Sequence, residues 1–283
     1  MNKIAIVTDS NSGITQEMAK ELGVYVLAMP FYIDGKLFFE GIDLTKEAFR
    51  EKQVGGADIG TSQPSPGDVI DMWDNLLQEY EQVLCIPMSS GLSSTCDTAM
   101  SLARDYDGRV VVVDNGRISV TLKQSVLDAL KLVAEGKNAQ EIATILEANK
   151  KDAKCILVVD DLKYLKKGGR ITPTAAAIGT VLNIKPVLVI QDEKIDSLAK
   201  VRGWKQAKKA LFDAMEAELE GPLKGQKVQV FVVHNCEPDA AELFLKEAQE
   251  RFAEYSLQVD TLPLSIVTHV GPGVMAMACA VEL

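Results

Sequence analysis

The sequence has little cysteine and little histidine, and neither is arranged to bind a metal. Its five cysteines, Cys85, Cys96, Cys155, Cys236 and Cys279, are scattered without a CxxC pair, and only two histidines occur. This composition lacks any structural zinc pattern. A chain of 283 residues also buries enough surface to fold without a disulfide or metal. We therefore expect no metal, no cofactor and a reducing cytoplasmic location.

Long apolar runs and an excess of positive charge are missing as well. No run approaches the roughly 18 apolar residues of a membrane-spanning helix, and the apolar start of the chain is too short for a signal peptide. Lys and Arg total 30 against 40 Asp and Glu, a net charge of -10. Such a surface repels phosphate backbones. Neither a membrane span nor a nucleic-acid partner is expected.

The first half of the chain alternates short apolar runs with longer helical patterns. The expected strands are Ile4–Thr8, Val24–Ile33, Gln82–Met88, Arg109–Asp114 and Cys155–Asp160, and the expected helices are Thr15–Leu22, Ser94–Tyr106, Ile118–Glu135 and Ala139–Lys150. Strands that are apolar on both faces are typical of a parallel sheet covered by helices. Asp34-Gly35 predicts a hairpin turn, and Ser65-Pro66 predicts a helix start. The fold class is therefore α/β.

The pattern changes after about residue 160. A hairpin is predicted between Val187–Ile190 and Ile195–Val201, and Thr172-Pro173 predicts the start of a helix over 174–182. The remaining elements expected are a helix Trp204–Leu219, a strand Val228–Val233, a helix Pro238–Tyr255 and a β-rich stretch from Leu257. We expect two domains, 1–160 and a smaller α/β domain, 161–283, with mixed or antiparallel strands. No linker separates the two domains, so the sequence fixes their boundary only approximately.

Two hydroxyl-rich loops each stand before a helix. Residues 60–65 (Gly-Thr-Ser-Gln-Pro-Ser) form the first loop, and residues 89–95 (Ser-Ser-Gly-Leu-Ser-Ser-Thr) follow an apolar strand and form the second. A loop at the carboxyl edge of a parallel sheet, beside a helix N-terminus, favours a phosphate or carboxylate. Serines also commonly cap helices, so capping is the alternative for both loops. Together the loops raise the odds of one shared anion pocket.

The two histidines differ in context. His269 lies where we expect a strand to end in the turn Gly271-Pro272-Gly273. A histidine there can supply a neutral donor or a cation near neutral pH, and a carboxylate partner would suit it. His234 ends another predicted strand, where we interpret it as a hydrogen-bonded structural residue.

Positive charge gathers at residues 163–170 of this acidic chain. Lysines at a helix C-terminus before a glycine cap explain most of it. Arg170 lies beyond that cap, where its guanidinium is available to clamp a phosphate or a partner's carboxylate. Arg202, at the end of the predicted hairpin, is a weaker candidate for the same role.

The signatures GxSxG, GxxxxGK[ST] and HExxH do not occur in the sequence, so the hydrolase, P-loop and zincin interpretations lack their motifs. Catalytic triads are recognised by geometry rather than by order in the chain. A serine-dependent hydrolase or phosphotransferase, with Ser93 as nucleophile and His269 as base on a small acyl or phosphate substrate, therefore stays open.

Five segments together resemble the DegV family: residues 7–10 (Val-Thr-Asp-Ser), 60–64, 89–95, 165–171 (Leu-Lys-Lys-Gly-Gly-Arg-Ile) and 269–273 (His-Val-Gly-Pro-Gly). They span nearly the whole chain in the family's order, which is far more specific than any one motif. The resemblance implies an α/β first domain, a smaller α/β second domain and an apolar tunnel between them. Family members bind a long-chain fatty acid. In the bacterial fatty acid kinase system they present the acyl carboxylate to a separate ATP-binding kinase subunit.

The resemblance also implies roles for single residues. Thr61 and Ser93 become hydrogen-bond donors to the carboxylate, with His269 as a third group nearby. Arg170 and Arg202 would face the kinase subunit or the acyl phosphate. Cys96 departs from the small or polar residue expected after the second loop.

A lipid-binding subunit without catalysis of its own fits the physics of this sequence. A buried carboxylate needs hydroxyl and N–H donors, because leaving it unpaired costs several kcal/mol. Each buried methylene of the tail contributes about 0.8 kcal/mol, so tight binding requires no nucleophile or metal. The enzyme described above and a pure interaction module are the alternatives.

Overall fold

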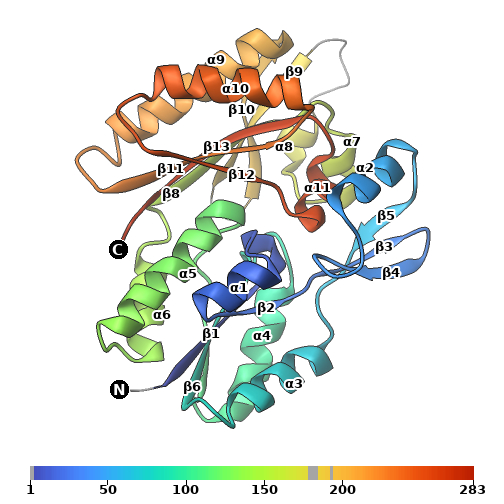
Figure 1. Ribbon diagram of the computed structural model, residues 1–283. Helices are drawn as coiled ribbons and strands as arrows, with labels where there is room; N and C mark the ends of the chain where they lie inside the picture. The colour runs from blue at the N-terminus through green and yellow to red at the C-terminus, as the bar shows by residue number, and fades with distance from the viewer. Residues whose placement is uncertain (1–2, 178–183, 192–193) are drawn as a thin grey trace.

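The computed structural model describes residues 3–177, 184–191 and 194–283 (Figure 1). One sheet is parallel throughout, as predicted, with strand order β2-β1-β6-β7. Its strands are β1 (Ile4–Asp9), β2 (Tyr25–Leu27), β6 (Gln82–Ile86) and β7 (Val110–Val112). The loops that follow β1 and β6 consequently leave the same edge of this sheet.

Helices cover both faces of the parallel sheet (Figure 1). They are α1 (Gln16–Leu22), α5 (Ser119–Ala134) and α6 (Ala139–Ala148) on one face, and α3 (Pro66–Leu76) and α4 (Thr95–Ala103) on the other. In β1, Ile4 and Ile6 belong to the core shared with α5, whereas Ala5 and Val7 pack with Trp73 of α3. Alternate side chains of a strand point to opposite faces of the sheet. A strand that is apolar throughout therefore requires helices on both faces.

The stretch 24–33, expected to be one strand, is two. β2 stays in the parallel sheet, whereas β3 (Pro30–Ile33) pairs with β4 (Lys36–Phe39) and β5 (Ile59–Thr61) in a small antiparallel sheet beside α2 (Lys46–Val54). The expected hairpin turn is confirmed: Asp34 and Gly35 have φ values of 49° and 78°, as a type I′ turn requires.

The other large sheet is mixed, as predicted, with strand order β10-β9-β8-β13-β11-β12 and parallel pairing between β11 and β12. Its strands are β8 (Ala153–Val158), β9 (Ile184–Gln191), β10 (Lys194–Arg202), β11 (Val228–Asn235), β12 (Leu257–Thr261) and β13 (Val274–Val281). The predicted hairpin is the antiparallel pair β9 and β10.

One strand prediction was wrong in its partner. The run at Cys155 was assigned to the parallel sheet, but β8 pairs antiparallel with β9 and β13. Helices cover both faces of each large sheet, so a doubly buried strand has the same apolar sequence in either one. The strands from β8 onward therefore belong to the mixed sheet. The domain division at residue 160 stays a prediction.

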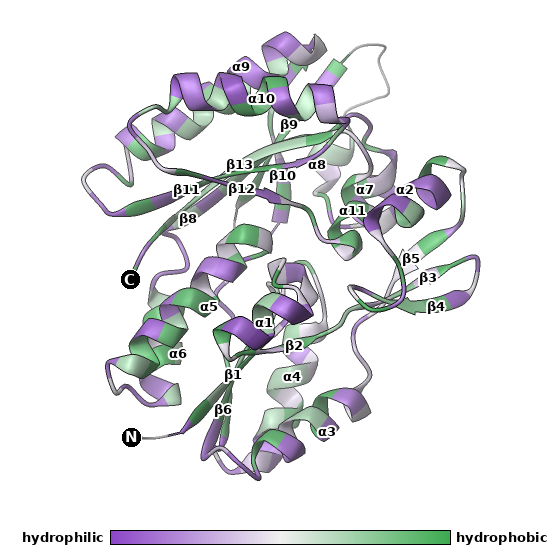
Figure 2. Cartoon of the chain, viewed as in Figure 1, coloured by the Kyte–Doolittle hydropathy of each residue, from purple (hydrophilic) through white to green (hydrophobic). Residues whose placement is uncertain are grey.

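The outer face of the mixed sheet is covered by α9 (Gly203–Glu220) and α10 (Pro238–Arg251), which carry many hydrophilic residues in Figure 2. The inner face packs on α5. Strand β13 shows why: Ala276, Ala278 and Ala280 face the core of α5, whereas Met275 and Met277 face α9. Small side chains on one face let the helix approach the sheet closely.

Shorter elements complete the chain. They are the single-turn helices η1 (Ser10–Ser12) and η2 (Arg104–Tyr106) and the helices α7 (Lys163–Gly168), α8 (Pro173–Ala176) and α11 (Leu264–Val270). The predicted caps are confirmed, because Ser65 Oγ accepts from Asp68 N at 3.1 Å and Thr172 Oγ1 from Ala175 N at 3.2 Å. Most of the helix expected over 174–182 lies outside the described residues.

Helix α5 should carry much of the stability, because its core face touches both large sheets. Leu122 is 0% exposed, and we expect Leu122→Ala to lower the free energy of unfolding by about 2–5 kcal/mol. Chemical denaturation measures this change. The matched control is Leu243→Ala on α10, where Leu243 is 52% exposed and a change of less than about 0.5 kcal/mol is expected. Equal effects of the two substitutions would contradict this assignment of the core.

Candidate ligand-binding site

A cavity of about 290 Å³ opens where the loops after β1 and β6 face α11 and β10. Its lining includes exposed residues, Ser62 and Ser94, and deeply buried ones, Asn11, Met29 and Ser265. The exposed residues define a mouth and the buried ones an inner end. The cavity therefore runs from the surface into the core between the two large sheets.

Both hydroxyl-rich loops reach this cavity, because Thr61 and Ser93 line it. The capping alternative also holds in part: Ser65 caps α3, and Ser93 Oγ accepts from Thr95 N at 3.3 Å and lies 2.9 Å from Thr95 Oγ1. Ser94, at the N-cap of α4, makes no side-chain capping bond. Each loop thus begins a helix and supplies one hydroxyl to the same cavity.

Two acidic residues hold the loops in place. The buried Asp9 accepts from Met88 N at 2.8 Å and from Asn11 N at 2.9 Å, which joins the ends of β1 and β6. Asp114 accepts from Ser90 Oγ at 2.6 Å and so anchors the loop after β6. Burial raises the pKa of Asp9, and its hydrogen bonds oppose that shift.

His269 lies on a helix, not at the end of a strand as predicted. Its segment contains Ile266-Val267-Thr268, a β-branched run that resembles a strand, but the run is buried on every side as helix α11. Propensity is a weak guide where tertiary packing surrounds an element. The helix ends at Gly271, whose φ of 77° suits glycine.

His269 Nε2 lies 2.8 Å from Thr61 Oγ1, so the two candidate residues meet directly. Burial lowers the pKa of His269 to about 4, with the positive charge of Arg170 as a second cause. The imidazole is therefore neutral at pH 7. Gly168 packs against it so closely that a Cβ at Gly168 would lie 2.3 Å from His269 Nδ1.

Arg170 lies at the mouth of the same cavity and is exposed. Its Nε donates to Leu92 O at 3.3 Å, and its Nη1 donates to the carbonyl of Gly168. The guanidinium thus links the second hydroxyl loop to the end of α7, beside His269. Four of the five predicted residues, Thr61, Ser93, His269 and Arg170, surround one cavity.

Arg202 is not brought to this cavity. Ile195, near the start of β10, lines the cavity, whereas Arg202 is the last residue of that strand. At about 3.3 Å per strand residue, Arg202 lies roughly 20 Å further along the sheet. It is exposed at the start of α9.

His234 lies on β11, as predicted, but not as a fully hydrogen-bonded residue. Within the described part of the chain, its buried Nδ1 has no hydrogen-bond partner. Burial lowers the pKa of the half-buried His234, with the positive charge of Lys46 as a second cause.

Three residues that sequence reasoning missed belong to the site. Asn11 and Ser265 line the inner end, and the buried Glu40 accepts from Ser265 Oγ at 2.7 Å. Asn11 follows β1 at the same sheet edge as the loop after β6, a signal that could have found it. Glu40 follows Phe38-Phe39 and gives no such signal. Burial raises its pKa.

Two classes of site find no support in the described ranges. No group of three or more His, Cys, Asp or Glu residues there is arranged to hold a metal ion. Nor does any helix within those residues have the length and apolar character needed to cross a membrane.

Comparisons with known proteins extend over the whole chain. The DegV model, described as "Uncharacterised protein, DegV family", matches residues 3–282. A DegV domain-containing protein of Halalkalibacterium halodurans is 32% identical over 285 residues, covering 100% of both chains. A fatty-acid-binding DegV family protein from Thermus thermophilus has a TM-score of 0.89 at 30% identity, covering 99% of both chains. A fatty-acid-binding DegV family protein from Streptococcus agalactiae has a TM-score of 0.90 at 28% identity, covering 100% of both chains.

The low pKa of His269 predicts acid sensitivity of the ligand-free protein. The ordinary value is 6.5 and the folded value about 4, so in this window the unfolded histidine binds a proton that the folded one excludes. The stability due to neutral His269 is complete above pH 6.5 and is lost as the pH falls to about 4. We expect His269→Gln to flatten the fall of the thermal midpoint across this range, and NMR to show His269 titrating near its lower end. A titration midpoint at the ordinary value would contradict the burial argument.

Proposed function

This chain belongs to the DegV family, and on that premise we propose that it binds a long-chain fatty acid. The carboxylate lies at Thr61, Ser93 and His269, and the tail lies in the deeper part of the cavity. One observation carries the proposal: two hydroxyls and a neutral imidazole from distant segments line one cavity together with a set of apolar side chains, and Thr61 contacts His269 directly. The solved relatives that bind fatty acids support it.

The head end has the donors that a carboxylate needs. With the proton of the neutral imidazole on Nε2, His269 donates to Thr61 Oγ1, which leaves the Thr61 proton free to donate to the ligand. Ser93 supplies a second hydroxyl. The positive charge of Arg170, which helps to lower the pKa of His269, also favours an anion at this point.

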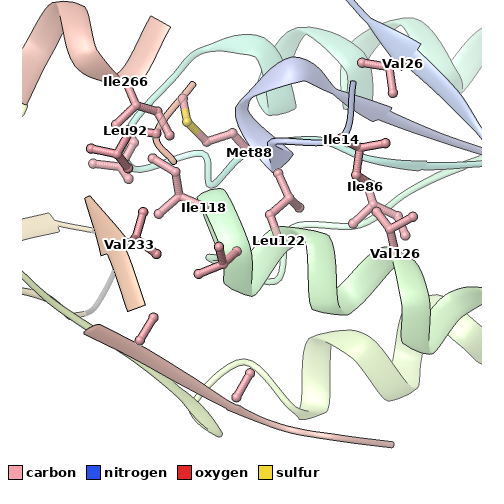
Figure 3. Packing of buried hydrophobic residues seen from close by; sticks show 14 of the residues in the cluster. Ile14, Val26, Ile86, Met88, Leu92, Ile118, Leu122, Val126, Val233 and Ile266 are labelled. Atoms are coloured by element: carbon pink, nitrogen blue, oxygen red, sulfur yellow. The ribbon is translucent and has the colours of Figure 1, made fainter. Parts of the chain in front are cut away.

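The tail end has the apolar surface that an acyl chain needs. Figure 3 shows Met88, Leu92, Ile118 and Ile266 lying together, and all four line the cavity. These residues come from the loop after β6, the start of α5 and α11. Each methylene transferred from water to this surface contributes about 0.8 kcal/mol. The volume of about 290 Å³ lies at the lower end of the usual range for small-molecule pockets, roughly 300–1,000 Å³.

We further propose that the chain presents the carboxylate to a separate ATP-binding kinase subunit and performs no catalysis itself. The exposed mouth residues Ser62, Ser94 and Arg170 leave the head end open to such a partner. Arg170 is placed to contact an acyl phosphate formed there. Arg202 is too far along β10 for that contact, so its proposed role is to bind the kinase. The cytoplasmic location stays a prediction.

The serine-enzyme alternative finds less support in this geometry. His269 Nε2 is 2.8 Å from Thr61 Oγ1, and Ser93 Oγ is paired with Thr95 Oγ1 at 2.9 Å. A base for Ser93 would have to form a hydrogen bond to its hydroxyl. Esterase activity of a lipid-free protein would favour the enzyme, and absence of both lipid and activity would favour the interaction module.

Mass spectrometry of the purified protein should find bound long-chain fatty acid. We expect Thr61→Ala and Ser93→Ala each to weaken binding by about five- to a hundredfold, because each leaves part of a buried carboxylate unpaired at a cost of about 1–3 kcal/mol. Ser101→Ala, an exposed serine on α4, is the control and should change nothing. Unchanged retention in both site variants would count against the site.

Arg170→Ala should separate binding from presentation. An exposed charge contributes at most about 1 kcal/mol, so we expect fatty-acid affinity to fall by no more than about fivefold. Acyl phosphate formation with the purified kinase subunit and ATP should fall far more. The control is Arg104→Ala, which alters an exposed arginine that does not line the cavity. If the substitution abolished fatty-acid binding, while the fatty acid still bound were phosphorylated at the normal rate, Arg170 would instead be a residue of the pocket.

A further inference from the structure

A second cavity, of about 170 Å³, lies behind the inner end of the first. Four buried polar residues stand between them, and we name them the wall: Ser10, Asn11, Glu40 and Ser265. Asn11 and Ser265 line the first cavity, and Ser10 and Glu40 line the second. The wall thus has one side in each cavity.

Hydrogen bonds within the wall use its polar atoms. Glu40 accepts from Ser10 Oγ at 2.9 Å, from Ser265 Oγ at 2.7 Å and from Leu264 N at the start of α11. Asn11 Nδ2 donates to Asp9 Oδ1 at 2.9 Å, and its Oδ1 lies 2.6 Å from Ser265 Oγ, whose single proton is shared between Asn11 and Glu40. The polar atoms of the wall are therefore paired within the protein and need no hydrogen bond from a ligand. The apolar end of an acyl chain can pack against the wall.

Both cavities are apolar beside the wall. Met29, Met88 and Ile118 line the first cavity, and Ile14 and Val26 line the second. The exposed Gln16 and Lys46 also line the second cavity, but an acyl chain already in the first cavity could enter the second only by separating Glu40 from its donors. That would leave a buried carboxylate unsatisfied, which is far more costly than the burial of a few methylenes is favourable.

We propose that this wall sets the upper limit of acyl length, with Glu40 as the residue that determines it. The inference rests on the proposed fatty-acid binding and names the specificity of that same cavity. Affinity rises with each methylene until the methyl end meets Asn11 and Ser265, and then levels off. When the Glu40 side chain is cut back to a methyl group the two cavities join, and longer chains gain further buried surface.

The test measures affinity for saturated fatty acids from decanoate to eicosanoate on delipidated protein. In the wild type and in the equal-sized control Glu40→Gln, we expect a rise of about fourfold per methylene followed by a plateau. In Glu40→Ala the rise should continue for at least two further methylenes, so the longest acids bind about tenfold or more tighter than to the wild type. A plateau at the same length in folded Glu40→Ala, or no plateau in the wild type, would overturn the proposal.

Two further measurements keep the test decisive. Ser265→Ala removes only the hydroxyl that joins Asn11 to Glu40, and it should move the plateau in the same direction by less. A crystal structure of the wild type with stearate should place the methyl end against Asn11 or Ser265; a methyl end elsewhere refutes the wall. Failure of the wild type to bind any of these acids would instead reject the proposed function, and the wall with it.

Discussion

Two buried carboxylates hold this cavity together. Asp9 joins the ends of two neighbouring parallel strands through N–H donors, and Glu40 joins the end of β4 to the first turn of α11 through N–H and hydroxyl donors. Hydrogen bonds to charged groups are worth about 1.5–3 kcal/mol each, and losing one inside a protein leaves a costly unpaired charge. The positions of α11, and of His269 upon it, depend on these bonds.

The polar residues at the two ends of the cavity differ in their charge and in their partners. Toward the mouth, Thr61 and Ser93 line the cavity together with Arg170, whose positive charge also acts on His269. At the inner end, Asn11 and Ser265 bond to protein groups. Polar residues thus occur at both ends of the cavity, and the positively charged Arg170 lies at the mouth. The proposed ligand, a fatty acid, has a matching distribution, with a charged carboxylate at one end and an apolar tail.

Sequence reasoning succeeded where chemistry is local. The parallel sheet, the Asp34-Gly35 turn and the helix caps follow from short segments, whereas the meeting of Thr61, Ser93 and His269 was implied by the resemblance to the DegV family. It failed where contacts between residues far apart in the chain determine the secondary structure or the strand partner. Residues 156–158 of β8 and most of helix α11 are buried, so their composition does not reveal their partner or even their periodicity. Glu40 gave no signal because its donors lie far away along the chain.

The place of β8 in the mixed sheet bears on how the molecule is divided. This strand precedes residue 160, yet it lies between β9 and β13, near the middle of a sheet otherwise built from later residues. A fragment beginning at residue 161 would lack that strand and expose two unpaired edges, the kind of surface that drives aggregation. Recombination between relatives would therefore keep all six strands of this sheet from one parent only if the crossover fell before residue 153.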